Sequence, residues 1–212
     1  MKYKHIVTAA VTAFALVGAA HANVSLVGSQ AAFTAAGTVS QNTNWDSYGA
    51  GFSFPGSPFT VGNETFVQGA SNLIGGVGTG YNLARNLLTD NNVAGTTIDL
   101  SGQFNLFAVN AGNFLGAATE TFTVTTNLGT YSFAPTVSNA VNLGALTFVG
   151  FEAGQGEYFQ SIQFTGSGAT GVTDVQIGSV STVPEPASMS LMLMGLAGVG
   201  AAVRSRRKNT GA

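Results

Sequence analysis

Carboxylates are almost the only reactive side chains between residues 23 and 183. This stretch holds eight acidic residues and a single cation, Arg85, so its net charge is −7. Both histidines, His5 and His21, precede it, and the chain has no cysteine. Ser-His-Asp and Cys-His catalysis need an imidazole base, and a Ser-Lys pair needs a lysine that this stretch lacks. A zinc site would also lack its usual ligands, so we expect no enzyme and no catalytic residue.

Paired carboxylates are the chemistry that remains, because glycoside hydrolysis needs only two of them. Glu152 and Glu157 flank the turn Gly154-Gln155-Gly156 and could approach each other across that loop. The alternative, which we favour, is that both are solvated loop acids. An exported carbohydrate-active hydrolase therefore stands as the second functional hypothesis.

Four aromatic residues near the start of this stretch are candidates for binding sugar. Trp45, Tyr48, Phe52 and Phe54 lie close together in the sequence beside prolines. Aromatic rings can stack on sugar rings, but most such clusters belong to a hydrophobic core. The sequence leaves both interpretations open and names no ligand. The negative charge argues against nucleic acid as a partner, because nucleic acid requires a basic face.

The elements that must position these residues are β-strands. Residues 120–126 alternate, with Phe122 and Val124 on one face, and the turn Asn127-Leu128-Gly129 leads into a second strand at 130–133, which predicts a hairpin. Further strands are predicted at 65–68, 96–100, 104–109, 146–151, 158–164 and 172–177. Ser29 to Ala36 predicts a short helix with Ser29 as N-cap and Phe33 facing the core, and Asn82 to Thr89 predicts another helical turn or two. We expect one all-β, antiparallel, jelly-roll-like β-sandwich over residues 23–178.

The N-terminal segment has the three parts of a secretory signal peptide in order. Lys2 and Lys4 precede an apolar stretch from Ile6 to Ala20, and Ala20-His21-Ala22 provides a cleavage site of small residues. We therefore predict a signal peptide over residues 1–22 that signal peptidase removes, and an exported domain that follows it.

The C-terminal segment predicts a membrane anchor. Residues 179–186 form an expected linker that ends in Pro184-Glu185-Pro186, and residues 187–203 are apolar enough for a single transmembrane helix. A basic tail, residues 204–212, follows and is expected on the cytoplasmic side. Its cations are Arg204, Arg206, Arg207 and Lys208.

This order of parts, Pro-Glu-Pro, apolar helix and basic cluster, resembles the PEP-CTERM sorting domain over about the last 30 residues. The resemblance implies processing by a membrane transpeptidase called exosortase, with cleavage near the triplet. It also implies a Gram-negative host that makes exopolysaccharide. The chain would then be anchored in the inner membrane before processing and afterwards lie at the cell surface or outside the cell. The favoured function is a non-enzymatic surface or matrix protein associated with exopolysaccharide.

The exported domain also resembles, more diffusely, domains that are common in this sorting class. The segments that carry the resemblance include Trp45-Asp46 near its start and Asp174-Val175-Gln176-Ile177-Gly178 near its end. The first and last strands of a jelly roll are often neighbours, so Asp46 and Asp174 could share a calcium ion, whose preferred ligands are oxygens. The alternative is that each carboxylate caps a turn. We predict calcium as the metal, and no other cofactor.

Overall fold

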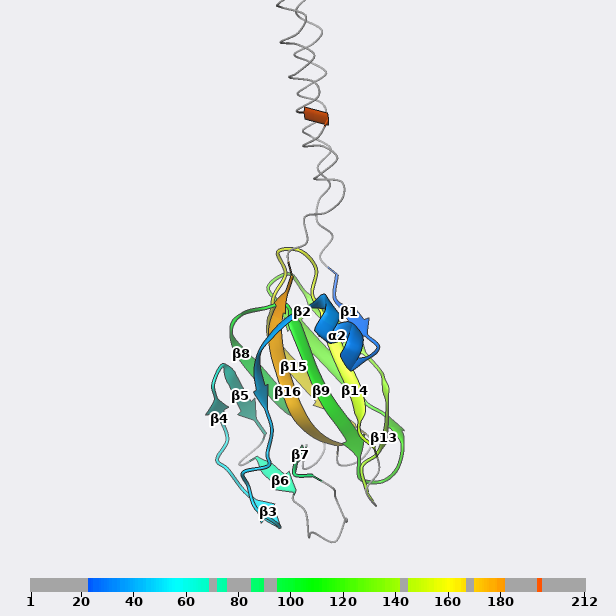
Figure 1. Ribbon diagram of the computed structural model, residues 1–212. Helices are drawn as coiled ribbons and strands as arrows, with labels where there is room; N and C mark the ends of the chain where they lie inside the picture. Colours follow the sequence, from blue (N-terminus) through cyan, green and yellow to red (C-terminus); the bar gives the residue numbers. More distant parts are fainter. Residues whose placement is uncertain are drawn as a thin grey trace, which may run out of the picture. The chain divides into compact units, whose positions relative to one another are not determined.

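The computed structural model describes residues 23–68, 72–75, 85–89, 95–141, 145–166, 170–181 and 194–195. The chain divides into two compact units, Met1–Val180 and Ser181–Ala212. The first unit carries all the strands of the described residues (Figure 1). In the second unit only Ser181, Met194 and Gly195 are described.

The first unit is a β-sandwich of two sheets, which confirms the predicted all-β sandwich (Figure 1). The larger sheet runs in the order β1 (Ser25–Val27), β14 (Thr147–Glu152), β9 (Leu106–Asn113), β16 (Thr170–Val180), β7 (Leu87–Thr89), β6 (Leu73–Gly75) and β3 (Phe52–Ser53). Off this path, β2 (Gly37–Thr43) pairs with β16, and β13 (Thr136–Asn139) pairs with β9 and with β10 (Ala118–Thr119). The pairing of β13 with β9 is parallel.

The smaller sheet is antiparallel throughout. Its order is β12 (Thr130–Phe133), β11 (Thr121–Thr126), β15 (Phe159–Thr165), β8 (Thr96–Phe104), β5 (Glu64–Val67) and β4 (Phe59–Val61). The predicted hairpin is confirmed, because β11 and β12 pair with Phe122 opposite Phe133 and Val124 opposite Tyr131. The jelly-roll connection of the strands stays a prediction.

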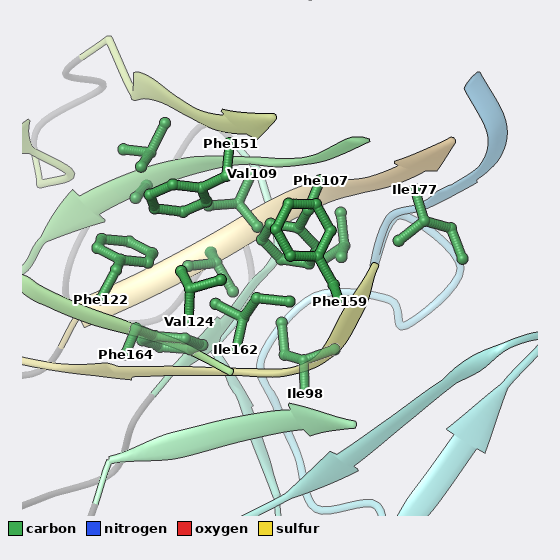
Figure 2. Close-up of a cluster of buried hydrophobic side chains, with 14 of the residues drawn as sticks. Ile98, Phe107, Val109, Phe122, Val124, Phe151, Phe159, Ile162, Phe164 and Ile177 are labelled. Carbon is green, nitrogen blue, oxygen red and sulfur yellow. The ribbon is translucent and has the colours of Figure 1, made fainter. Parts of the chain in front are cut away.

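The core lies between the two sheets and consists of the side chains that alternate inward on each strand. Phe107, Val109 and Phe151 come from the larger sheet, while Phe122 and Phe164 come from the smaller one, and all five are almost fully buried. Figure 2 shows the side chains of both sheets pointing toward one another. This packing is expected because a strand turns every second residue to the same face.

The predicted short helix is confirmed as α2 (Gln30–Ala36). The Ser29 hydroxyl accepts a hydrogen bond from the Ala32 amide, which satisfies one free N–H at the helix start. Phe33 is buried and packs edge-on against Phe148 of β14, with 5.7 Å between ring centroids. The helix therefore covers part of the outer face of the larger sheet (Figure 1).

Two local expectations are wrong. The helical turn predicted at Asn82–Thr89 is wrong for Leu87–Thr89. These three residues form strand β7, because they pair with both β6 and β16. Residues 82–84 of the predicted turn lie outside the described residues. The predicted linker begins too early, because β16 continues to Val180. There Ser179 lies opposite Thr38, and the Val180 amide donates to the Asn105 side chain.

Candidate functional site

The two carboxylates predicted to share calcium both contact the guanidinium of Arg85. Its Nη1 lies 2.5 Å from Oδ2 of Asp174, and its Nη2 lies 3.0 Å from Oδ1 of the same carboxylate. Nη2 also lies 3.2 Å from Oδ2 of Asp46. Arg85 therefore forms a bidentate ion pair with Asp174 and a single hydrogen bond with Asp46. We call these three residues the Arg85 cluster.

Asp174 is placed by an irregularity in the central strand β16. The register against β9 shifts between Thr173 and Gln176, and Asp174 has a positive φ of 50°. A residue other than glycine rarely adopts this conformation, so surrounding contacts must hold it. The Asn110 amide donates to Oδ2 of Asp174 at 2.9 Å, and the bidentate Arg85 completes the set.

Asp46 is placed by a turn that Asn86 holds. The side-chain nitrogen of Asn86 lies 2.8 Å from the Trp45 carbonyl and 3.0 Å from the Tyr48 carbonyl. The Asp46 amide itself donates to the Asn44 side chain at 3.2 Å. Adjacent residues, Arg85 and Asn86, thus fix both the carboxylate and the backbone of this turn.

The two ion pairs of the cluster differ in strength. The side chain of Asp174 is 12 % exposed, that of Arg85 is 38 % exposed and that of Asp46 is 56 % exposed. Water screens the outer pair strongly and the inner pair much less. The hydrogen bond to Asp174 is the main reason why the pKa of Arg85 rises above its usual value, so the arginine stays charged.

The sequence suggested that Asp46 and Asp174 share calcium, whereas in the structure both carboxylates are paired with Arg85. In the described part of the chain, no group of three or more His, Cys, Asp or Glu side chains comes together to hold a metal. Calcium stays a prediction, and an ion here would compete with the guanidinium. The missed signal was the charge count, because one arginine among eight acids is expected to pair with some of them.

Glu152 and Glu157 were expected to be solvated loop acids, with a hydrolytic pair as the alternative. The expectation of a solvated side chain is wrong for Glu157. Glu157 is 2 % exposed, and its Oε1 accepts a hydrogen bond from the Thr126 hydroxyl at 2.5 Å. A further hydrogen bond to Glu157 raises the pKa of Tyr131. Glu152 is half-buried at the end of β14, opposite Ser25 of β1 and Leu106 of β9. Glu157 is therefore bound inward, into the corner next to the β11–β12 turn.

The predicted aromatic cluster divides into a core residue, a partly buried residue and a surface pair. Trp45 is fully buried, and its indole N–H donates to the Val172 carbonyl at 2.8 Å. Its ring packs edge-on against Phe66, with centroids 5.1 Å apart. Phe52 and Phe54 are 51 % and 64 % exposed. Tyr48 is partly buried and packs edge-on against Trp45, with centroids 6.3 Å apart. Phe52 and Phe54 are thus the more exposed rings of the cluster.

The predicted signal peptide, with Ala20 and Ala22, lies outside the described residues, and so do Pro184, Glu185, Pro186 and the basic tail. The predicted transmembrane segment, residues 187–203, is described only at Met194 and Gly195. Within the described ranges no helix is long and apolar enough to cross a membrane.

Comparison with known proteins decides the nature of the C-terminal segment. Residues 182–208 match the PEP-CTERM protein-sorting motif. The chain carries this sorting motif. The match confirms the predicted resemblance and marks an exported protein that is anchored in the membrane before an exosortase processes it. No curated protein and no solved structure matches the chain.

Loss of the arginine should cost more stability than loss of its exposed partner. Arg85→Met leaves the largely buried Asp174 without its cation, so we expect unfolding to become easier by about 2 kcal/mol. This is less than the roughly 3–5 kcal/mol for breaking a fully buried pair, because Arg85 is partly exposed. Asp46→Asn, at the exposed end, should cost well under about 1 kcal/mol. Urea unfolding of both variants measures this difference.

Thermal melting of the domain tests calcium binding. A ligand that binds only the native state raises the melting temperature, so millimolar Ca²⁺ should stabilise the wild type and Asp174→Ala should abolish the effect. Equal melting in Ca²⁺ and in chelator would refute calcium binding and would leave Arg85 as the cation of the cluster.

Proposed function

We propose that this chain is a non-enzymatic surface or extracellular-matrix protein whose β-sandwich associates with exopolysaccharide after exosortase processing. The observation that carries the proposal is the PEP-CTERM sorting motif at residues 182–208. Export through a cleaved signal peptide and retention by a transmembrane helix at residues 187–203 are parts of this proposal.

The arrangement of the acidic residues supports a binding role over the hydrolase alternative. A hydrolase of this type would need both carboxyl groups to face a substrate. Glu157, one of the two candidates, is instead buried and bonded to Thr126. A pair with the half-buried Glu152 would therefore have one carboxyl group held inside the domain.

The sorting step is tested by replacing Pro184-Glu185-Pro186 with three alanines. The change leaves the apolar segment and the basic cluster intact, so insertion should proceed while recognition fails. We expect the full-length protein to accumulate in the inner membrane and the processed form to disappear from the surface fraction. Immunoblots of the separated fractions measure both.

A matched control is Ser188→Ala together with Ser190→Ala, which alters the same region and spares the triplet. This variant should be processed like the wild type. If the triple-alanine variant also reaches the surface at the wild-type level, Pro-Glu-Pro is only a linker and the proposed processing is wrong.

A further inference from the structure

The outer face of the six-stranded sheet is lined almost entirely by hydroxyl and amide groups. On these strands Phe66, Ile98, Val124 and Ile162 point into the core, so the residues between them point outward. The outward residues in the middle of the sheet are Thr60, Thr65, Val67, Thr97, Asp99, Thr121, Thr123, Thr125, Thr130, Ser132, Ser161, Gln163 and Thr165. We call this set the hydroxyl face.

The strand register arranges the hydroxyl face in rows that cross the sheet. One row passes through every strand from β12 to β4 and consists of Thr130, Thr125, Ser161, Asp99, Thr65 and Thr60. A second row, beside the first, consists of Ser132, Thr123, Gln163, Thr97 and Val67. Neighbouring groups in a row are about 4.8 Å apart and the rows about 6.8 Å apart, as strand geometry requires.

Hydroxyl contacts at both ends of the first row show that the paired threonines there point to the same side of the sheet. The Thr60 and Thr65 hydroxyl oxygens lie 3.0 Å apart, and those of Thr125 and Thr130 lie 3.4 Å apart. All four can both donate and accept hydrogen bonds. Each threonine also exposes a methyl group, so the row offers hydrogen bonds and small apolar contacts together.

The charge of the hydroxyl face narrows the choice of partner. Asp99 is its only charged residue, although the exported stretch carries a net charge of −7. Nucleic acid and anionic lipid gain nothing from a surface without cations. Stacking against a second copy of the sheet would require apolar side chains, and only Val67 qualifies. The sheet is twisted, so a flat, rigid surface such as a crystal face would contact it poorly, whereas a flexible polymer chain can follow the twist.

We propose that the hydroxyl face binds a neutral polysaccharide chain that runs across the strands along these rows. The proposal rests on the proposed association with exopolysaccharide and names its site and the charge of its ligand. Sugar hydroxyls would exchange hydrogen bonds with the threonine and serine hydroxyls, while Asp99 and Gln163 would accept from others. The strand spacing is close to the length of one sugar unit in an extended chain, so successive sugars meet successive strands.

The test is native affinity electrophoresis of the full chain, purified in a detergent without a sugar headgroup. The gels contain hydroxyethyl cellulose or dextran as neutral probes, or alginate as an acidic one. The variant Thr60→Ala/Thr65→Ala/Thr125→Ala/Thr130→Ala removes both ends of the first row. We expect the wild type to be retarded by a neutral polymer and not by alginate. We expect the variant to bind the neutral polymer about tenfold or more weakly, because several hydrogen bonds are lost.

Two control variants keep the result specific. Thr119→Ala/Thr136→Ala removes a cross-strand threonine pair of the same kind from the larger sheet and should bind like the wild type. Phe52→Ala/Phe54→Ala removes the exposed rings and should also bind like the wild type. Thermal melting of every variant verifies that it is folded, and Thr→Ser replacement at the four positions, which keeps the hydroxyls, should restore binding if the alanine variant is unstable.

The outcomes separate this proposal from the one it rests on. If the wild type binds a neutral polymer and the row variant binds equally well, the hydroxyl face is not the site, but polysaccharide association stands. Loss of binding only in the Phe52/Phe54 variant would move the site to the aromatic pair. If no polymer retards the wild type, both polysaccharide proposals fail while the sorting assignment is unaffected, and preference for alginate would refute a neutral ligand.

Discussion

Trp45→Ala is expected to destabilise the β-sandwich by about 3–5 kcal/mol, the usual cost of removing a large buried aromatic side chain. Trp45 is fully buried and contacts Phe59 and Phe66, with ring centroids 5.9 Å and 5.1 Å away. The change also leaves the Val172 carbonyl without the indole donor. For a domain of this size the melting temperature should fall by about 10 °C. Far-UV circular dichroism suits the measurement, because the chain has one tryptophan and the variant has none.

Two other variants show whether the effect comes from burial. Trp45→Phe keeps an aromatic ring and loses the N–H, so it should cost about 1–2 kcal/mol. Phe52→Ala lies in the same aromatic segment, but its side chain is half exposed on β3, so it should cost under about 1 kcal/mol. Similar losses for Trp45→Ala and Phe52→Ala would show that Trp45 does not belong to the core.

The local part of the fold was predictable because it depends on neighbours in the sequence. The β11–β12 hairpin combines strict alternation with a short turn, and α2 begins at a serine whose hydroxyl caps it. The position of Leu87–Thr89 was not predictable in this way. Three residues carry no clear periodicity, and they form a strand only because β6 and β16 lie on either side.

The candidate site shows the same limit. The sequence suggested that Asp46 and Asp174 meet, because strands from the two ends of a sandwich often lie side by side. It could not show that Arg85 reaches both, since that depends on the irregular backbone of β16 at Asp174. The sequence also could not predict which ring of the aromatic cluster is buried, because only the tertiary fold decides which ring is covered.

Strand β5 begins at Glu64, a residue that the predicted strand at 65–68 left out. Glu64 shares its face with Phe66 in the alternation, so it points into the sandwich, and both side chains are fully buried. Neither carboxyl oxygen of Glu64 has a hydrogen-bond partner of normal geometry in the described structure. Burial raises the pKa of Glu64 from 4.5 to about 7, against smaller opposing contributions from Thr43 and Gln41. The strands that pack around it, β2, β4 and β8, present no other ionisable side chain to this face.

The stability of the wild type should therefore fall as the pH rises from about 4.5 to about 7, and Glu64→Gln should remove most of this dependence. Between these values the folded state holds a proton on Glu64 that the unfolded state releases, so raising the pH favours unfolding. A shift from 4.5 to about 7 corresponds to about 3 kcal/mol. About 2 kcal/mol of this lies between about pH 5.5 and 8, where most other carboxyl groups no longer titrate. Glutamine has the same shape and cannot ionise, so the variant should match the wild type near pH 5 and exceed it at pH 8. Urea unfolding at several pH values measures both slopes.

Asp99→Asn, an exposed acid on the adjacent strand β8, should keep the wild-type slope. If Glu64→Gln loses stability with pH as steeply as the wild type, Glu64 is not the group that titrates.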